Sequence, residues 1–229
     1  MLKKLSRSVC MALAAALGLA LIAPVAMAQA EQQKLVGAAD KTLSNFLRDP
    51  EMSWLQNNIG RAKAVLIAPE IVKAGFIFGG SGGRAVLVAH DAKSGKWVGP
   101  AFYTMATASV GFQAGVAVSE TITLVMTDKA LNSLLSSSFK IGADVSVAAG
   151  PVGAGAKSDV VADLIAFSRS KGVYGGLNLD GTVVKTSDDW NSAYFGKKVL
   201  PPDILVRADV KNAQADKLRS AIAKAHGAK

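Results

Sequence analysis

The sequence predicts an α+β domain in which a curled antiparallel β-sheet approaches a barrel and amphipathic helices flank the sheet at both ends. Three observations lead to this prediction. Apolar residues recur at helical spacing near both ends of the chain and alternate with period two between them. The links between expected strands are short, whereas parallel strands need long crossovers. Glycines within the expected strands are typical of a sheet that coils sharply: Gly111, Gly115, Gly142, Gly175 and Gly176.

The first 28 residues have the features of an export signal. A basic segment over residues 3–7 precedes an apolar stretch over residues 9–23, and Ala26-Met27-Ala28 forms a small-residue cleavage site. The apolar stretch is shorter than the about 20 residues that a membrane-spanning helix needs. We therefore expect residues 1–28 to be a signal peptide and the mature chain to be exported, to the periplasm or cell envelope or into the medium.

The mature chain, residues 29–229, is long enough for one domain, with a core expected at about 61–208. The only cysteine of the sequence, Cys10, lies in the predicted signal peptide, so the mature domain needs no disulfide. Removal of the three basic residues of the leader lowers the formal net charge from +9 to +6. This moderate excess favours anionic partners such as lipid headgroups.

The mature N-terminus is expected to be helical. Its apolar residues fall on one face of a helix: Leu35, Val36, Ala39, Leu43, Phe46 and Leu47. Lys34, Lys41 and Arg48 are seven residues apart and therefore line another face. Asp49 suits the N-cap of a second helix and Pro50 its first position. The core-facing residues of that helix are Trp54, Leu55 and Ile59.

From about Ala62 the apolar pattern has period two, which predicts strands. The strands are expected around residues 86–88, 96–98, 112–118, 122–126, 141–149 and 165–169. A five-residue turn, Asp91 to Gly95, joins the first two, and Asp180-Gly181 predicts a type I′ hairpin. Further helices are expected over Asp128 to Ser137 and over Asp188 to Phe195, the latter ending at Gly196. A basic amphipathic helix closes the chain, with Val210, Leu218, Ala221 and Ile222 apolar and Lys211, Lys217, Arg219 and Lys224 outside.

No catalytic set emerges from the motifs. Gly79 to Gly83 matches the G-x-S-x-G nucleophile motif, but the motif requires a helix after the serine, whereas Arg84 to Ala89 has the pattern of a strand. A glycine turn is therefore expected there, and Ser81 is not a nucleophile. The segment from Gly150 to Ser158 fails as a phosphate-binding loop, because Pro151 and Ala156 stand where glycines are required.

Other classes of site are also disfavoured. A mature chain with no cysteine and two isolated histidines is not expected to bind a metal, and no cofactor is expected. Two pairs of carboxylates, Asp159 with Asp163 and Asp188 with Asp189, are expected to be solvated or to cap helices. Sparse aromatic residues disfavour nucleic-acid binding. A membrane surface remains as the candidate partner, because both terminal helices combine an apolar stripe with cations. Alternatively, each stripe packs against its own domain.

Four glycine-punctuated segments, residues 74–83, 110–115, 147–153 and 167–177, resemble the SYLF domain family in order and spacing. The resemblance implies a lipid-binding module with a preference for phosphoinositides, a membrane contact near the N-terminus and no known catalytic residues. Some eukaryotic members of that family also bind actin. For an exported protein we expect the lipid to be phosphatidylglycerol, cardiolipin or a host lipid, and we expect actin binding less.

The resemblance places the membrane contact around Lys34 to Arg61. The residues expected to bind lipid are Lys34, Lys41, Phe46, Arg48, Arg61, Lys63 and Lys73. The leading hypothesis is thus a non-enzymatic peripheral protein that binds anionic phospholipid or phosphoinositide headgroups. The alternative is a structural or stress-related envelope protein, which acts through an unidentified protein partner or encloses an apolar ligand.

Overall fold

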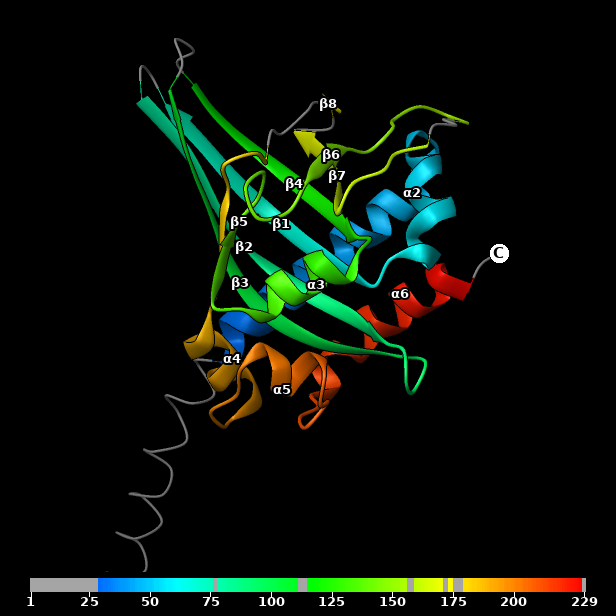
Figure 1. The fold of residues 1–229 in the computed structure, drawn as a ribbon, viewed down its shortest axis with the longest axis vertical. Helices are drawn as coiled ribbons and strands as arrows, with labels where there is room; N and C mark the ends of the chain where they lie inside the picture. The colour runs from blue at the N-terminus through cyan, green and yellow to red at the C-terminus, as the bar shows by residue number, and fades with distance from the viewer. Residues whose placement is uncertain are drawn as a thin grey trace, which may run out of the picture.

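The structure is a computed structural model that describes residues 29–75, 78–110, 115–155, 159–170, 173–174 and 179–227. In this part of the chain a curled sheet lies between two groups of helices (Figure 1). The predicted fold class is therefore confirmed. The predicted signal peptide, residues 1–28, lies outside the described residues, as do parts of the first, second and fourth glycine-punctuated segments.

A helix over residues 29–48, called the N-helix below, opens the described chain. Asp49 then caps a 3₁₀ turn, η1 (Pro50–Met52), by accepting a hydrogen bond from the backbone N–H of Glu51, as the Asp-Pro pair predicted. Two short elements follow, α2 (Ser53–Asn58) and η2 (Ile59–Arg61). The predicted core residues of this segment are all buried: Trp54, Leu55 and Ile59.

Four long strands form the centre of the sheet: β1 (Ala64–Gly75), β2 (Phe78–Asp91), β3 (Lys96–Val110) and β4 (Gly115–Val125). Five shorter strands extend the sheet: β5 (Ser138–Lys140), β6 (Val147–Ala149), β7 (Leu164–Ser170), β8 (Val173–Tyr174) and β9 (Val183–Thr186). The order is β5-β9-β3-β2-β1-β4-β7-β6, with β8 beside β7. Neighbouring strands are antiparallel except for β6 and β7, which are parallel. The register shifts within β1, beyond Ile67, and such bulges coil a sheet.

Two strand predictions are wrong. The segment 141–149 is not one strand, because Gly142 adopts a left-handed φ of 87° and the chain turns there before β6 pairs with β7. Asp180-Gly181 forms a turn but no hairpin, because β9 pairs with β3 and β5 rather than with the strand before the turn. The φ of Gly181 is positive, whereas that of Asp180 is not, so the type I′ conformation is absent.

The three later helix predictions are confirmed in type. They correspond to α3 (Asp128–Leu135), α4 (Asp188–Phe195) and α6 (Asp216–Gly227). Gly196 ends α4 with a φ of 70°. Val210 and Lys211 precede α6, after which the 3₁₀ turn η3 (Ala213–Ala215) leads into the helix. The sequence did not predict α5 (Pro201–Leu205), which begins at a proline.

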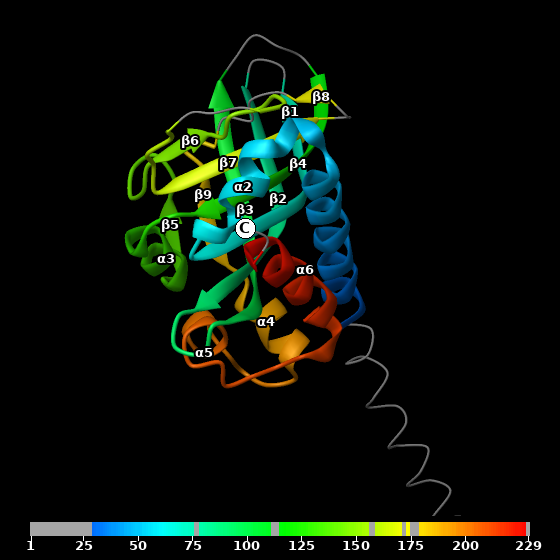
Figure 2. The ribbon, with the colours of Figure 1, turned by 90° about the vertical axis from the view of Figure 1, so that its right-hand side faces the viewer.

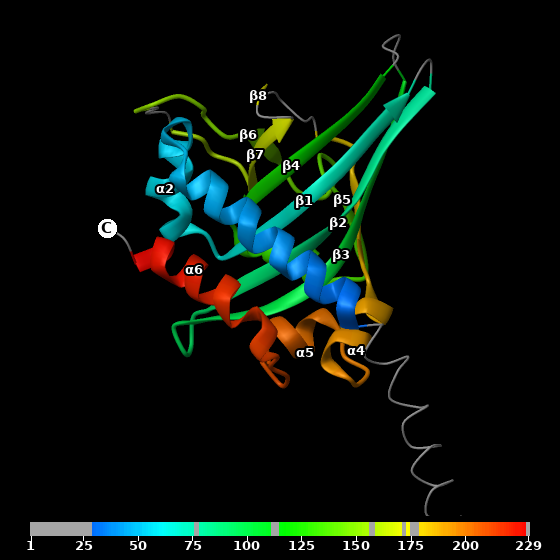
Figure 3. The same cartoon turned by 180° about the vertical axis from the view of Figure 1, so that it is seen from behind.

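The sheet is buried on both faces by different helices (Figures 2 and 3). On one side, the N-helix face, the N-helix, α2 and α6 pack on residues such as Val65, Ile67 and Ile122. On the other, the α3 face, α3 and α5 pack on their strand neighbours, such as Leu66 and Tyr103. The inner halves of the central strands are therefore apolar on both sides, and their sequences alternate between two cores rather than between core and water.

Candidate binding surfaces

The apolar stripes of both terminal helices face the protein's own sheet. Val36, Ala39, Leu43 and Phe46 of the N-helix are buried, as are Leu218 and Ile222 of α6. The alternative that the sequence left open is therefore the one observed, since neither stripe is presented to a lipid. Among the described helices, none has the length and apolar character needed to cross a membrane.

The structure places Phe46 in the core, although the predicted lipid-binding set includes it. Its side chain is 0% exposed, and the guanidinium of Arg169 lies 5.2 Å from the centre of its ring. The ring fills the core between the N-helix and the sheet, as its position on the apolar stripe requires. In this conformation Phe46 cannot contact a membrane, so its assignment to the lipid-binding set is corrected.

Four of the predicted cations do lie together on the outside of the helices. Lys34, Lys41 and Arg48 are exposed along the N-helix, and Arg61 is exposed in η2, which packs against α6. The N-helix and α6 lie side by side (Figure 3), and the Nζ of Lys217 in α6 is 2.7 Å from the Oδ2 of Asp40. We call the resulting set the basic helical surface: Lys34, Lys41, Arg48, Arg61, Lys217 and Lys224.

The other two predicted cations lie elsewhere. The Nζ of Lys63 is 2.9 Å from the Oδ1 of Asp128 at the start of α3, and this pairing draws the side chain away from the N-helix. Lys73 is exposed in the outer half of β1, two residues from Ile71 on the α3 face. The predicted lipid-binding set includes both residues because they lie near the N-helix in sequence. In the structure, the direction of β1 separates them from the basic helical surface.

A partly buried charge cluster joins the N-helix to the sheet. Arg169 of β7 donates through its Nε to the Oε1 of Glu120 on β4 at 2.7 Å, and its guanidinium lies 3.7 Å from the carboxylate of Asp49. Thr42 of the N-helix donates to the second carboxylate oxygen of Glu120 at 2.8 Å. Sequence reasoning did not find this cluster, because its members come from segments far apart in the chain. The cluster thus links the N-helix to β4 and β7.

Within the described part of the chain, both histidines lie far from the serine of the hydrolase-like motif. Ser81 lies within β2, opposite Thr107, so the predicted glycine turn is also wrong. His90 lies at the other end of the same strand, about 30 Å away at 3.3 Å per residue. The ring of His90 stacks instead on that of His226, with 4.7 Å between centroids. This arrangement does not activate a nucleophile.

Three of the four paired carboxylates have structural roles, and the fourth, Asp159, is exposed. Asp163 accepts hydrogen bonds from the hydroxyl of Thr127 at 2.7 Å and from the backbone N–H and hydroxyl of Ser146 at 2.9 Å. These donors, with Thr127 foremost, lower the pKa of Asp163 to about 2. Asp188 and Asp189 lie in the first turn of α4, where carboxylates interact favourably with the helix dipole. The described residues include no group of three or more side chains suited to hold a metal.

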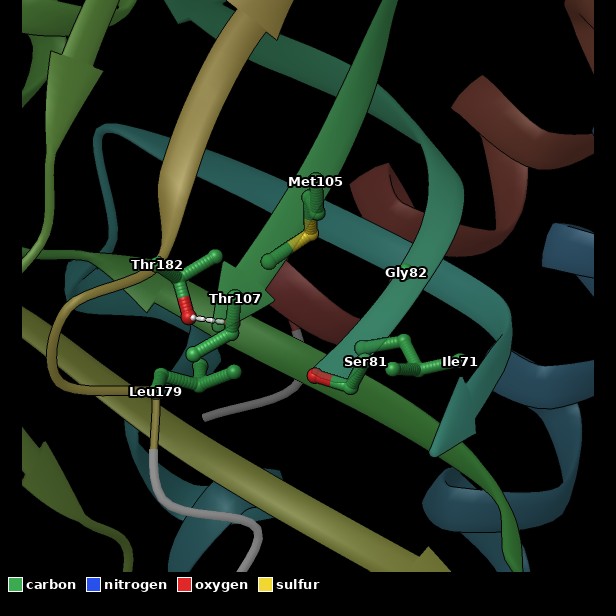
Figure 4. A pocket seen from close by; sticks show the side chains of 7 residues that line it. All are labelled: Ile71, Ser81, Gly82, Met105, Thr107, Leu179 and Thr182. Carbon is green, nitrogen blue, oxygen red and sulfur yellow. Dashed lines mark hydrogen bonds between the residues drawn. The ribbon is translucent and has the colours of Figure 1, made fainter. Parts of the chain in front are cut away.

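A small hollow lies against the α3 face (Figure 4). Its cavity volume is about 0 Å³, and it is lined by Ile71, Ser81, Gly82, Met105, Thr107, Leu179 and Thr182. The hydroxyls of Thr107 and Thr182 close one side through a hydrogen bond of 2.7 Å. Pockets for small molecules usually measure about 300 Å³ or more. This hollow is therefore too small for the enclosed apolar ligand that the alternative hypothesis envisaged.

Comparison with known proteins identifies the family. The family model described as "Ysc84: Las17-binding protein actin regulator" matches residues 106–225. LAS seventeen-binding protein 3 of Saccharomyces cerevisiae is 34% identical over 179 residues, which cover 73% of this chain and 39% of that protein. Protein YSC84 of the same yeast is 32% identical over 152 residues, covering 63% and 32% respectively.

A human relative extends the likeness beyond fungi. SH3 domain-containing YSC84-like protein 1 of Homo sapiens is 27% identical over 165 residues, or 70% of this chain and 48% of the relative. The chain thus spans less than half the length of these curated relatives. The family is described as an actin regulator and not as an enzyme family. The matched segment begins in the last third of β3 and extends through the later described elements to residue 225 in α6, and the chain belongs to the Ysc84 family, the SYLF domain family that its glycine-punctuated segments resemble.

Proposed function

We propose that this chain is a non-enzymatic module that attaches peripherally to anionic phospholipid membranes through the basic helical surface. The observation that carries the proposal is the gathering of six exposed cations on the outer sides of the N-helix, η2 and α6. Because the apolar stripes of both terminal helices are buried, the contact is electrostatic and involves no insertion of these helices.

The expected attachment is weak and reversible. A cation near an anionic membrane contributes on the order of 1 kcal/mol. Lys34 lies 2.7 Å from Glu31, and Lys217 pairs with Asp40, so these two contribute less. The other four together supply roughly 4 kcal/mol. Salt screens such contacts over about 8 Å at physiological ionic strength, so binding should fall as salt rises.

Cosedimentation with vesicles tests the proposal. The purified protein is expected to pellet with vesicles that contain phosphatidylglycerol, cardiolipin or a phosphoinositide, and not with phosphatidylcholine alone. The variant Lys41→Glu/Arg48→Glu/Lys224→Glu is expected to lose this binding. A matched variant with the same change in net charge, Lys93→Glu/Lys96→Glu/Lys198→Glu, reverses exposed cations elsewhere and is expected to keep most of it. Equal loss in both variants, or unchanged binding in the first, would show that the basic helical surface is not the site.

A protein partner is the second candidate function. The names of the relatives favour it, since one is a Las17-binding protein and the family is described as an actin regulator. Cosedimentation with actin filaments in place of vesicles tests this candidate. If the protein pellets with filaments and the first triple variant does not, the basic helical surface contacts a protein rather than a membrane.

A further inference from the structure

One part of the sheet carries an apolar face that no helix of the described chain covers. The outer halves of β1–β4 extend beyond the N-helix (Figure 3). The strand registers bring a set of small apolar residues together there, on the N-helix face, and we call this set the open sheet face: Val72, Ala74, Gly80, Gly82, Ala106, Ala108, Val116, Val118 and Val183. Four of its valines, Val72, Val116, Val118 and Val183, are 39, 69, 37 and 43% exposed.

The two sides of these strand segments differ in polarity. The α3 side carries three polar residues, Lys73, Ser81 and Thr107, together with Ala117 and the buried Val184. A solvated strand normally directs polar residues to water, and contiguous exposed apolar residues often mark an interaction site. Insertion of the strand ends into a membrane would bury the polar side as well. The one-sided pattern therefore favours a partner that covers only the N-helix face.

The geometry of this face suits a helix. Thr42 of the N-helix binds Glu120 on β4, so the N-helix crosses that strand next to Ile122. Val116 lies four residues from Glu120, or about 13 Å along the strand, which leaves room for a second helix beside the N-helix at a usual interaxial distance of about 10 Å. A flat membrane would meet the outer side of the N-helix first, since a helix stands about 10 Å thick above the sheet. A rod-shaped partner can reach the valines.

The size of the open sheet face and the charges at its border restrict further which kind of partner can bind there. The face is five strands wide, about 19 Å, and about three residues, or 10 Å, long, which is small beside the about 800 Å² per partner of a standard interface and favours one helix over a second copy of the chain. Arg84, Lys185 and Lys140 border the face on the N-helix side of β2, β9 and β5. Three acidic residues also lie near this border: Glu70 opposite Arg84, and Asp188 and Asp189, which line one pocket with Arg84 and Lys185. The guanidinium of Arg84 is held 3.9 Å above the ring of Trp190.

We propose that the open sheet face binds an amphipathic α-helix of a partner protein, whose apolar stripe covers the valines and whose acidic flank faces Arg84 and Lys185. The five strands from β4 to β9 span about 19 Å, which corresponds to about 13 residues of helix. This proposal deepens the second candidate function and rests on it. It does not use the basic helical surface, so vesicle binding can succeed or fail independently of it.

Two synthetic peptides of about 18 residues test the proposal, since shorter isolated helices are marginal. Both carry the same Leu/Ala stripe, with glutamates on the flank in one and lysines in the other, and binding to the purified full chain is measured by fluorescence anisotropy. The glutamate peptide is expected to bind at least tenfold more tightly. Val72→Asp and Val118→Asp are each expected to weaken its binding at least tenfold, and Arg84→Gln/Lys185→Gln to reduce the preference for glutamate.

The matched control is Val161→Asp, because Val161 is 97% exposed and lies outside the open sheet face. It is expected to leave peptide binding unchanged, and circular dichroism checks that every variant is folded. The proposal is overturned if neither peptide binds, if both bind equally, or if the aspartate variants match the control. A wild-type dimer that Val118→Asp converts to a monomer would assign the face to a second copy. Vesicle binding lost in Val118→Asp alone would assign it to a membrane.

Discussion

Two buried tyrosines show how differently the same side chain is used on the two faces of the sheet. The hydroxyl of Tyr103 donates to the carbonyl of Leu134 at 2.6 Å, and that carbonyl belongs to the last turn of α3, where helix carbonyls lack partners within the helix. The hydroxyl of Tyr194 has no hydrogen-bond partner among the described residues. Burial raises the pKa of both phenols, that of Tyr194 to about 12.

These contacts predict that replacement by phenylalanine changes the free energy of unfolding differently at the two tyrosines. Tyr103→Phe should lower the free energy of unfolding by about 1 to 2 kcal/mol, because it leaves the Leu134 carbonyl without its donor. Tyr194→Phe should leave that free energy unchanged or raise it by up to about 1 kcal/mol, because no hydrogen bond is lost and a buried polar atom is removed. Urea denaturation at neutral pH measures both values. Equal losses in the two variants would contradict this account.

At the scale of elements, one glycine of β2, Gly83, accommodates the bulge in the neighbouring strand β1. A Cβ atom at Gly83 would lie 2.2 Å from the carbonyl oxygen of Glu70, just past the register shift in β1. A Cβ atom at Gly82 would lie 3.5 Å from the carbonyl oxygen of Met105, an ordinary contact. The close approach of the β1 backbone, rather than a turn, therefore requires the glycine at position 83.

The adjacent glycines should respond differently to alanine. Gly83→Ala should lower the free energy of unfolding by more than about 2 kcal/mol, because the backbone of β1 must move to accept the methyl group. Gly82→Ala should change it by less than about 1 kcal/mol, since the site has room and alanine restricts the unfolded chain. Thermal unfolding followed by circular dichroism compares the two. Similar melting temperatures for both variants would show that β1 adjusts without cost.

Local signals explain which elements the sequence predicts. The helix at 188–195 has acidic residues in its first turn and a glycine stop, both of which act within a few residues. The segment 141–149 has an equally clear alternation, yet its second half pairs in parallel with β7, which follows it by more than a dozen residues. Alternation predicts extended backbone but not the partner strand, so it cannot separate one strand from two.

At the scale of the whole molecule, one sheet supports two cores. The N-helix and α6 cover one side and α3 and α5 the other, and both clusters include residues from the same central strands. Loss of either cluster therefore exposes strands that the other needs. We expect the two cores to unfold together, because neither is complete without the shared sheet.

Cavities on opposite sides test this coupling. Leu43→Ala opens a cavity on the N-helix face, and Leu134→Ala opens a cavity on the α3 face. Each substitution should lower the free energy of unfolding by about 2 to 5 kcal/mol. Each variant should still unfold in a single transition, seen alike by tryptophan fluorescence and circular dichroism. The double variant should show nearly additive losses, because the sites share no contact across the sheet. Two separate transitions in either single variant would contradict the shared-sheet account.

The amino-acid sequence by itself determined the α+β class, the family and most helices. Periodicity, capping residues and glycine spacing are local, so they can be seen without coordinates. The export signal at residues 1–28 stays a prediction.

Only the tertiary structure decided which surfaces meet water. A stripe of apolar residues beside lysines describes equally a helix in a lipid interface and a helix packed on its own sheet. Packing placed Phe46 in the core, drew Lys63 to Asp128 and left the valines of the outer strands exposed. Hydrophobic patterning shows which residues favour burial, but what covers them depends on contacts between segments distant in the chain.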